Sequence, residues 1–211
     1  MITTHQYLDK YLIAAESEKL IVGTIHPHQH QSFSIPFFYG NVSSLWILLS
    51  NAFPNELKKP ITLEGVLNFL HNKKIAVSDT IRKCSRKNLT AFDSDLIPIE
   101  LNTKMIADIR KSAIKEILFT SGFGKNSAFK LFYTDILGLK ITQEIKENRE
   151  IIMGESIFGR PIKLKVLYSP SGSSNVGIAQ SKLYKMNQAK YKNSKRPVHD
   201  FKLDYYKNIF S

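Results

Sequence analysis

The stretch that decides the fold runs Leu20-Ile-Val-Gly-Thr-Ile-His-Pro-His-Gln-His-Gln-Ser-Phe-Ser-Ile-Pro-Phe-Phe-Tyr-Gly-Asn-Val-Ser-Ser-Leu-Trp46. It begins with a short apolar run, Leu20 to Val22, which Gly23 closes. Such a run is typical of a strand that is buried on both faces, as in a parallel sheet. A polar loop with three histidines and two prolines follows the run. Because open α/β sheets place their ligands at the carboxyl ends of such strands, we interpret this loop as the active site.

Two later segments repeat the pattern of a predicted buried strand followed by polar residues. Residues 114–120 predict a strand before Ser121-Gly-Phe-Gly, and residues 162–168 predict another before the serine-rich loop 169–175. Helical patterns lie between the predicted strands, which favours the α/β class. We expect a three-layer α/β/α sandwich around a mainly parallel, roughly four-stranded central sheet. In such a sheet the first loop and the serine-rich loop are expected to face one groove.

The remaining patterns complete a predicted single domain over residues 1–211. Residues 3–15 and 62–72 have helical spacing, and residues 96–101 predict a short strand whose proline is best placed at an edge or at a strand end. A helix after the serine-rich loop is expected to place Val176, Ala179, Leu183 and Met186 on one face. A basic extension begins at about residue 191. It predicts either a partly ordered tail that gains structure on DNA or a docked C-terminal helix.

The charge of the chain points to a polyanionic partner. Its 211 residues include 30 Lys and Arg against 18 Asp and Glu, a net charge of +12. From Arg160 onward there are eleven Lys and Arg against two acids. A basic surface of this size favours nucleic acid. The alternative is a generally lysine-rich composition with no such partner.

Cysteine usage and hydropathy favour an intracellular protein. The single cysteine, Cys84, excludes an internal disulfide and a four-cysteine metal site. No apolar run is long enough to span a membrane, and the first residues lack the layout of a signal peptide. We therefore expect a cytoplasmic protein with no membrane partner.

Several motifs, taken in chain order, resemble one family of enzymes. A Gly…Pro loop after the first strand, an aromatic segment that ends in Trp46, and a late Ser-Pro-Ser-Gly loop resemble the uracil-DNA glycosylase superfamily. The nearest branches are the mismatch-specific uracil/thymine and the hypoxanthine-DNA glycosylases. Residues 75–86 also resemble the hypoxanthine branch, which has an aspartate-containing turn before a basic, cysteine-bearing stretch. The similarity covers most of residues 19–190.

This resemblance implies a DNA repair enzyme that acts in base excision repair. A deaminated or mismatched base, uracil or hypoxanthine, is flipped out of the DNA and its N-glycosidic bond is hydrolysed. We expect a monofunctional glycosylase because no lysine lies in the motif loops to form a Schiff base. The resemblance implies no metal and no cofactor. DNA, duplex or single-stranded, is the expected partner, and we expect a monomer.

The resemblance also implies roles for individual residues. Family members usually carry Asp or Asn immediately before the first-loop proline, where this chain has His26. We hypothesise that His26, as a general base, and Asn41 share the activation of water. The residues expected to contact the base are Gly23, Thr24, Pro27, Phe38, Tyr39, Thr120 and Ser121. Those expected to bind the DNA backbone are Ser169, Pro170, Ser171, Gly172, Ser173, Ser174, Asn175 and Lys182.

Two other functions are compatible with the sequence. The first is a catalytically silent nucleic-acid-binding protein with the same fold, because the usual acid or amide of the first loop is missing. The second is a metal-dependent hydrolase that uses His26, His28 and His30, since a catalytic zinc site needs about three protein ligands. The basic run from Arg82 to Lys87 predicts phosphate contacts, although such a run is usually a solvated face.

Overall fold

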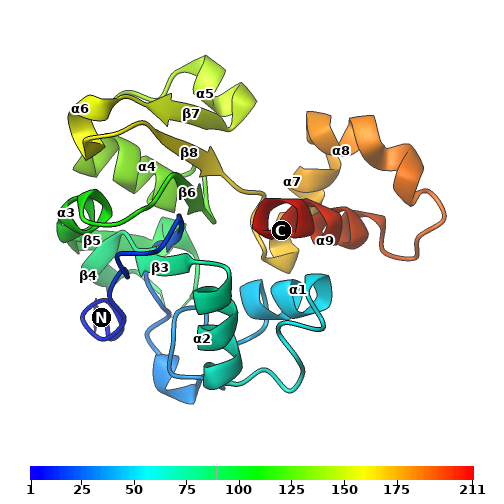
Figure 1. Ribbon diagram of the computed structural model, residues 1–211, viewed down its shortest axis with the longest axis horizontal. Coiled ribbons are helices and arrows are strands. Elements are labelled where there is room, and N and C mark those ends of the chain that lie inside the picture. The colour runs from blue at the N-terminus through cyan, green and yellow to red at the C-terminus, as the bar shows by residue number, and fades with distance from the viewer. Residues whose placement is uncertain (89) are drawn as a thin grey trace. The chain divides into compact units, whose positions relative to one another are not determined.

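The computed structural model describes residues 1–88 and 90–211, and its contacts divide the chain into two compact units (Figure 1). Unit 1 comprises Met1–His30 and Lys74–Leu167. Unit 2 comprises Gln31–Lys73 and Tyr168–Ser211. Each unit is therefore assembled from two segments that are far apart in the sequence.

A five-stranded sheet forms the centre of unit 1. Its strands are β2 (Lys19–Gly23), β3 (Ile75–Asp79), β6 (Glu116–Phe119), β7 (Glu150–Met153) and β8 (Ile162–Val166). Their order is β3-β2-β6-β8-β7, and all neighbours are parallel except β7, which runs antiparallel to β8 at one edge. The predicted α/β class with a mainly parallel sheet is confirmed. The sheet has five strands where roughly four were expected, and neither β3 nor the antiparallel strand β7 was predicted from the sequence.

Helices of unit 1 bury one face of this sheet (Figure 1). They are α3 (Lys104–Arg110), α4 (Ala128–Lys130), the π-helix η3 (Leu131–Ile136), α5 (Gln143–Asn148) and α6 (Glu155–Phe158). Alternate residues of the central strands, such as Leu20, Ile117 and Leu164, pack with Phe129 and Phe132 in one apolar core. The intervening residues of β2 and β6 are buried as well. Burial on both faces explains why these strands read as continuous apolar runs.

A second sheet in unit 1 has three antiparallel strands. They are β1 (Ile2–Thr4), β4 (Ile81–Arg86) and β5 (Leu96–Leu101), in the order β1-β4-β5. The predicted short strand at residues 96–101 is thus confirmed as β5, which lies at an edge of this sheet. The predicted helix at residues 3–15 is wrong. There β1 pairs with β4, and the ring of His5 accepts the N–H groups of Tyr7 and Leu8, contacts that the local pattern does not reveal.

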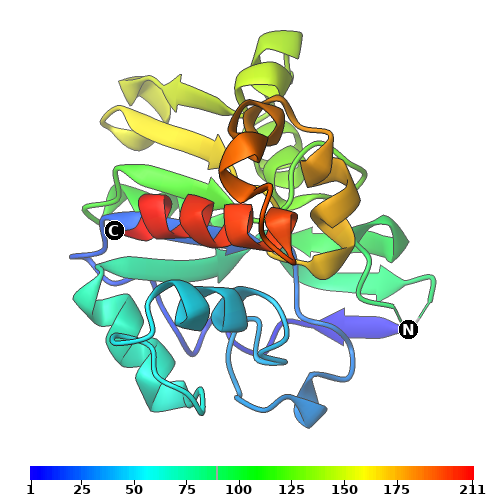
Figure 2. The ribbon, with the colours of Figure 1, turned by 90° about the vertical axis from the view of Figure 1, so that its right-hand side faces the viewer.

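Helices make up most of unit 2. They are α1 (Leu45–Ala52), α2 (Leu63–Asn72), the 3-10 turn η4 (Gly172–Ser174), α7 (Asn175–Ala179), α8 (Lys182–Asn187), the 3-10 turn η5 (Gln188–Tyr191) and α9 (Pro197–Phe210). Figure 2 shows α9 as a long helix, and it contacts α1, α7 and α8. Thr62 caps α2 by accepting the N–H of Gly65, so the predicted helix at residues 62–72 is confirmed.

Two predictions for the second segment of unit 2 have a definite outcome. The basic extension is a docked helix, since Phe201, Tyr206 and Phe210 of α9 are buried. The expected apolar face after the serine-rich loop is wrong, because Val176 is 78% exposed and Met186 is 72% exposed. The chain breaks there into α7 and α8, since the hydroxyl of Ser181 caps a new helix.

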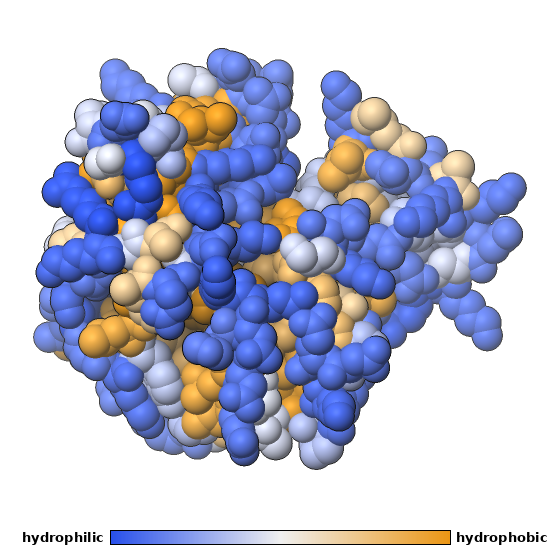
Figure 3. All heavy atoms as spheres, in the orientation of Figure 1, coloured by the Kyte–Doolittle hydropathy of each residue, from blue (hydrophilic) through white to orange (hydrophobic). Residues whose placement is uncertain are grey.

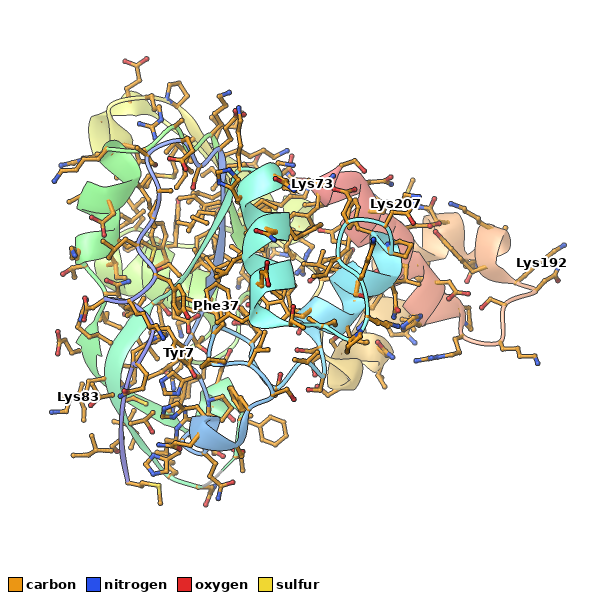
Figure 4. All side chains as sticks on the ribbon, turned by 60° about the horizontal axis from the view of Figure 1, so that its bottom comes forward. Tyr7, Phe37, Lys73, Lys83, Lys192 and Lys207 are labelled. Atoms are coloured by element: carbon orange, nitrogen blue, oxygen red, sulfur yellow. The ribbon has the colours of Figure 1, made fainter. Side chains whose placement is uncertain are left out.

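In the part of the chain that the structure describes, no helix combines the length and apolar character needed to cross a membrane. Hydrophilic side chains cover most of the face shown in Figure 3. Exposed lysines belong to this polar surface. Figure 4 labels two of them in unit 2, Lys192 between η5 and α9 and Lys207 on α9.

Candidate active site

The four parallel strands of unit 1, which are β3, β2, β6 and β8, all end at one edge of the sheet. The turn after β2 is fixed by backbone contacts. The carbonyl of Gly23 accepts the N–H of Thr80 at 3.0 Å, and the carbonyl of Thr24 accepts the N–H of Ile81 at 3.0 Å. The hydroxyl of Thr120, at the end of β6, donates back to the carbonyl of Val22. Thr24 and Ser121 are the half-buried hydroxyl residues at these two strand ends.

One carboxylate is bound between these hydroxyl groups. Asp93 lies in the 3-10 turn η2 (Asp93–Asp95), and its Oδ1 accepts a hydrogen bond from Thr24 Oγ1 at 2.8 Å. The hydroxyl of Ser121 also hydrogen-bonds to this carboxylate. Asn126 Nδ2 donates to the main-chain carbonyl of Asp93 at 3.1 Å, which anchors the turn. Side chains of two other loops, the loop after β2 and the loop after β6, therefore fix the turn that carries this half-buried carboxylate.

The surroundings of Asp93 make it a better proton acceptor than an ordinary carboxylate. Burial raises the pKa of Asp93, and the charge of Asp79 raises it further. Hydrogen bonds from Ser121 and Thr24 lower the pKa, as does the charge of Arg86. A carboxylate whose pKa is raised, in a half-buried position, is typical of a general base.

A second carboxylate in unit 1 is enclosed. Asp79, at the end of β3, is buried, and its Oδ2 accepts a hydrogen bond from His5 Nε2 at 2.8 Å. His5 Nδ1 accepts the N–H groups of Tyr7 and Leu8, so the ring is held in one tautomer. Burial raises the pKa of Asp79, while His5 and the N–H of Gly23 lower it. This pair orders the N-terminal segment against the end of β3.

His26, the predicted general base, is 4% exposed and fully hydrogen-bonded. Its Nδ1 donates to the carbonyl of Pro27 at 2.9 Å, and its Nε2 accepts the N–H of Gln6 at 3.1 Å. Burial lowers the pKa of His26 to about 4, so the ring is neutral at neutral pH. Its basic nitrogen is already engaged by a backbone amide, which leaves Asp93 the more accessible proton acceptor. The catalytic role of His26 stays a prediction.

Of the three alternating histidines, His26 and His30 have ring centroids 4.1 Å apart, but both ring nitrogens of His26 are hydrogen-bonded to the backbone. His28 Nδ1 pairs with Thr3 Oγ1 at 3.1 Å, and His30 Nδ1 pairs with the carbonyl of His28 at 3.2 Å. Over residues 1–88 and 90–211, no group of three or more His, Cys, Asp or Glu is arranged to hold a metal ion. The geometry therefore does not favour the metal-dependent hydrolase.

Part of the basic run in β4 serves the protein itself. Arg86 is 5% exposed and donates to Thr3 Oγ1, to the carbonyl of Thr90 and, at 2.7 Å, to the carbonyl of His26. Arg82 forms a two-point ion pair with Asp9, at 2.6 and 3.0 Å. Arg86 therefore stabilises the first loop, and Arg82 stabilises the N-terminal segment. Because both guanidinium groups bind the protein itself, the structure does not support the predicted phosphate contacts of these two arginines.

The aromatic segment lies in unit 2 and forms a tight turn. Phe38 is buried, and its carbonyl accepts the indole N–H of Trp46 at 2.7 Å. Gly40 has no space for a side chain, because a Cβ would lie 2.0 Å from the carbonyl oxygen of Ile35. The turn leaves Tyr39 half-buried and Asn41 exposed. Of the two rings predicted to stack on a base, Tyr39 is the more accessible.

The serine-rich loop also lies in unit 2 and is tied together by its own hydroxyl groups. Ser174 Oγ donates to the carbonyls of Ser169 and Ser171, at 2.9 and 2.6 Å. The hydroxyls of Ser171 and Ser173 lie 2.8 Å apart. Gly172 and Ser173 are exposed, as is Lys182 at the start of α8, whereas Pro170 is buried. The loop is thus a rigid turn with an exposed tip.

The oxygen Oδ1 of Asn175, at the start of α7, is buried and has no hydrogen-bond partner among the residues that the structure describes.

Sequence patterns did not single out Asp93 or His5, and they included Asp79 only as the aspartate of the turn within residues 75–86, with no role at the site. Asp93 meets Thr24 and Ser121 only after the chain has folded, since 69 residues separate it from Thr24. The one local signal is a pair of aspartates directly before the strand at residues 96–101. Such a pair also describes an ordinary turn.

Comparison with known proteins identifies a shared fold. No family model and no curated protein matches the chain. The solution NMR structure of a "putative Uracil DNA glycosylase" from Methanosarcina acetivorans aligns over 96% of this chain and 95% of that chain, with a TM-score of 0.50 and 19% identity. This chain therefore has the same α/β fold as that protein.

Proposed function

We propose that this chain is a DNA glycosylase of the uracil-DNA glycosylase superfamily. It hydrolyses the N-glycosidic bond of a deaminated or mismatched base, uracil or hypoxanthine. The fold shared with the Methanosarcina acetivorans protein, the family motifs in chain order and the net charge of +12 support this function. The observation that carries it is the half-buried carboxylate of Asp93, bound by Thr24 and Ser121 at the carboxyl edge of the parallel sheet.

In the proposed reaction Asp93 activates the attacking water. The bond between C1′ of the sugar and the base nitrogen breaks, and the base leaves with the electron pair. The oxygen of water then bonds to C1′, and its proton passes to the carboxylate of Asp93. The negative charge of Asp93 also stabilises the positive charge that develops on the sugar. No metal or cofactor takes part in this scheme.

The other predicted residues keep roles that the same chemistry needs. We assign base contacts in unit 1 to Gly23, Thr24, Pro27, Thr120 and Ser121. In unit 2, Tyr39 is the better candidate for stacking on a base, because Phe38 is 1% exposed. The serine-rich loop and Lys182 are assigned to DNA phosphates. Asn41 stays a candidate for orienting water.

A cleavage assay on labelled duplexes tests the function. The duplexes carry uracil, hypoxanthine, xanthine or a G·T mismatch, and alkali converts abasic sites to strand breaks. We expect cleavage at one of these lesions and a loss of about 100- to 1,000-fold in turnover for Asp93→Asn, with duplex affinity unchanged. Asp95→Asn is the matched control. The Asp95 carboxylate accepts a hydrogen bond from Thr90 and not from Thr24, so this variant should retain wild-type turnover.

Other results of the assay would revise the proposal. Cleavage by Asp93→Asn at the wild-type rate, with none by His26→Ala, would return the general-base role to His26. Loss only in Asn41→Ala would assign the water to Asn41. If the wild-type protein cleaves no lesion but binds duplex DNA in a salt-sensitive manner, the catalytically silent DNA-binding protein is the correct description.

A further inference from the structure

Unit 2 contains a buried lysine that the proposed reaction does not use. Lys202, on α9, is 2% exposed. Its Nζ donates to three consecutive main-chain carbonyls, those of Ser169 at 3.4 Å, Pro170 at 3.2 Å and Ser171 at 2.9 Å. All three belong to the serine-rich loop. The ammonium group of Lys202 therefore fixes the backbone of the first three residues of that loop.

A second side chain of α9 extends this contact. Tyr206 lies one helical turn after Lys202 and on the same face. Its hydroxyl donates to the carbonyl of Tyr168 at 2.7 Å. Four consecutive carbonyls, from Tyr168 to Ser171, are thus bound by two side chains of a single helix. The main-chain carbonyl groups that follow β8 therefore attach this part of the backbone to α9.

Among the residues that the structure describes, no carboxylate forms an ion pair with Lys202. In the described part of the chain, the hydrogen-bond acceptors of its Nζ are the three carbonyls. Burial lowers the pKa of Lys202 to about 8, so the ammonium is charged at neutral pH. A buried charge without a counter-ion costs folding free energy, because only dipoles replace its hydration. An anion bound by the loop would offset this cost.

The hydroxyl-rich part of the loop faces the solvent. Gly172 and Ser173 are exposed, and the hydroxyls of Ser171 and Ser173 lie 2.8 Å apart at this tip. Because Lys202 binds the carbonyls on the buried side, the loop can present donors to an anion on the exposed side. The positive charge behind the loop would strengthen every such contact.

We propose that Lys202 is a positioning residue, which fixes the serine-rich loop and places a positive charge behind it for a backbone phosphate of DNA. The proposal rests on the proposed function only in taking DNA as the ligand. Lys202 itself does not touch the phosphate. It acts through the carbonyls of Ser169, Pro170 and Ser171.

Binding of a short undamaged duplex tests the proposal, with affinity measured over a range of salt concentrations. We expect Lys202→Met to weaken binding by about tenfold and to reduce the salt dependence by about one phosphate contact. Lys202→Arg, which keeps the charge and several donors, should recover most of the affinity. Lys207→Met removes an exposed lysine from the same helix and should change affinity by less than about twofold. Thermal melting of each variant shows that it is folded.

The outcomes separate this proposal from the proposed function. Wild-type affinity and salt dependence in a folded Lys202→Met variant would overturn it, even if the wild-type protein cleaves a lesion. Equal losses in Lys202→Arg and Lys202→Met at unchanged melting temperature would also overturn it, because charge would then play no part. Weak binding by Lys202→Met that Lys202→Arg restores would support it, even if no lesion is cleaved.

Discussion

The first loop of unit 1 and the serine-rich loop of unit 2 both follow strands of one parallel sheet, yet each is fixed in a different way. In the first loop, neutral His26 donates to the carbonyl of Pro27 and accepts the N–H of Gln6. In the serine-rich loop, charged Lys202 donates to three carbonyls. Burial lowers the pKa of His26 from 6.5 to about 4 and that of Lys202 from 10.5 to about 8. At neutral pH the histidine is therefore neutral and the lysine is charged.

This difference matches the chemistry proposed for each loop. The neutral His26 adds no positive charge to the first loop, and the proton acceptor proposed for the site of unit 1 is a carboxylate. A charged lysine behind the serine-rich loop favours an anion instead. Two basic residues that look alike in a sequence thus serve opposite electrostatic purposes.

The largest effect expected from this comparison is a dependence of stability on pH that comes from His26. The pKa of His26 is about 4 in the folded protein and 6.5 in its ordinary state. The contribution of neutral His26 to the free energy of unfolding is therefore complete above pH 6.5, and it is lost as the pH falls through 4. Between these limits the free energy of unfolding should fall by up to about 3 kcal/mol. Urea unfolding of the wild type and of His26→Gln from pH 7 to pH 4 measures the difference.

His71 is the matched control, because it is an exposed histidine on α2. His71→Gln should leave the pH dependence of the wild type unchanged. If His26→Gln and the wild type lose stability in parallel, His26 is not a buried neutral group and the comparison fails.

A smaller effect is expected from the hydroxyl that binds Asp93. Thr24 Oγ1 stabilises the ionised carboxylate, so Thr24→Val should raise the pKa of Asp93. The acidic limb of the rate profile should move to higher pH by about one unit. Single-turnover cleavage rates across the acidic range measure this shift. Thr4→Val, at an exposed position in β1, should leave the profile in place. A shift to lower pH in Thr24→Val would contradict the assignment.

The smallest effect is expected at an exposed ion pair. Arg82 contacts Asp9 at 2.6 and 3.0 Å, and these contacts hold the pKa of Asp9 below its ordinary value. Because the Asp9 side chain is 68% exposed, Asp9→Asn should change the free energy of unfolding by only about 0.5 kcal/mol. Urea unfolding at neutral pH checks this value. If Asp9→Asn lowers the free energy of unfolding by as much as the protonation of His26 does, exposed ion pairs also contribute substantially to the stability of unit 1.

The parts of the fold that follow from local sequence were predictable. The strands β2 and β6 are largely apolar and buried on both faces, β8 alternates buried apolar residues with lysines, and Thr62 is an ordinary helix cap. The N-terminal segment was not predictable, because His5 binds Asp79 across 74 positions. The strand β7 has only four residues, too few for a recognisable pattern, so its pairing with β8 defines it.

The candidate site was predictable in place but not in its chemistry. The polar turn after β2 lies at the carboxyl edge of the sheet, as its position in the sequence indicates. Asp93 was missed because its partners come from two other loops. Lys202 was missed because a lysine in a basic segment is usually solvated, and only the packing of α9 against its neighbours buries it.

The interrupted construction of unit 2 has a consequence for how the protein reaches its native state. The helix α1 ends at Ala52, whereas its packing partner α9 begins at Pro197. Contacts between such distant segments require a long chain loop to close first, and proteins rich in them fold slowly. We therefore expect the pairing of α1 with α9, and with it the burial of Lys202, to be among the last events of folding.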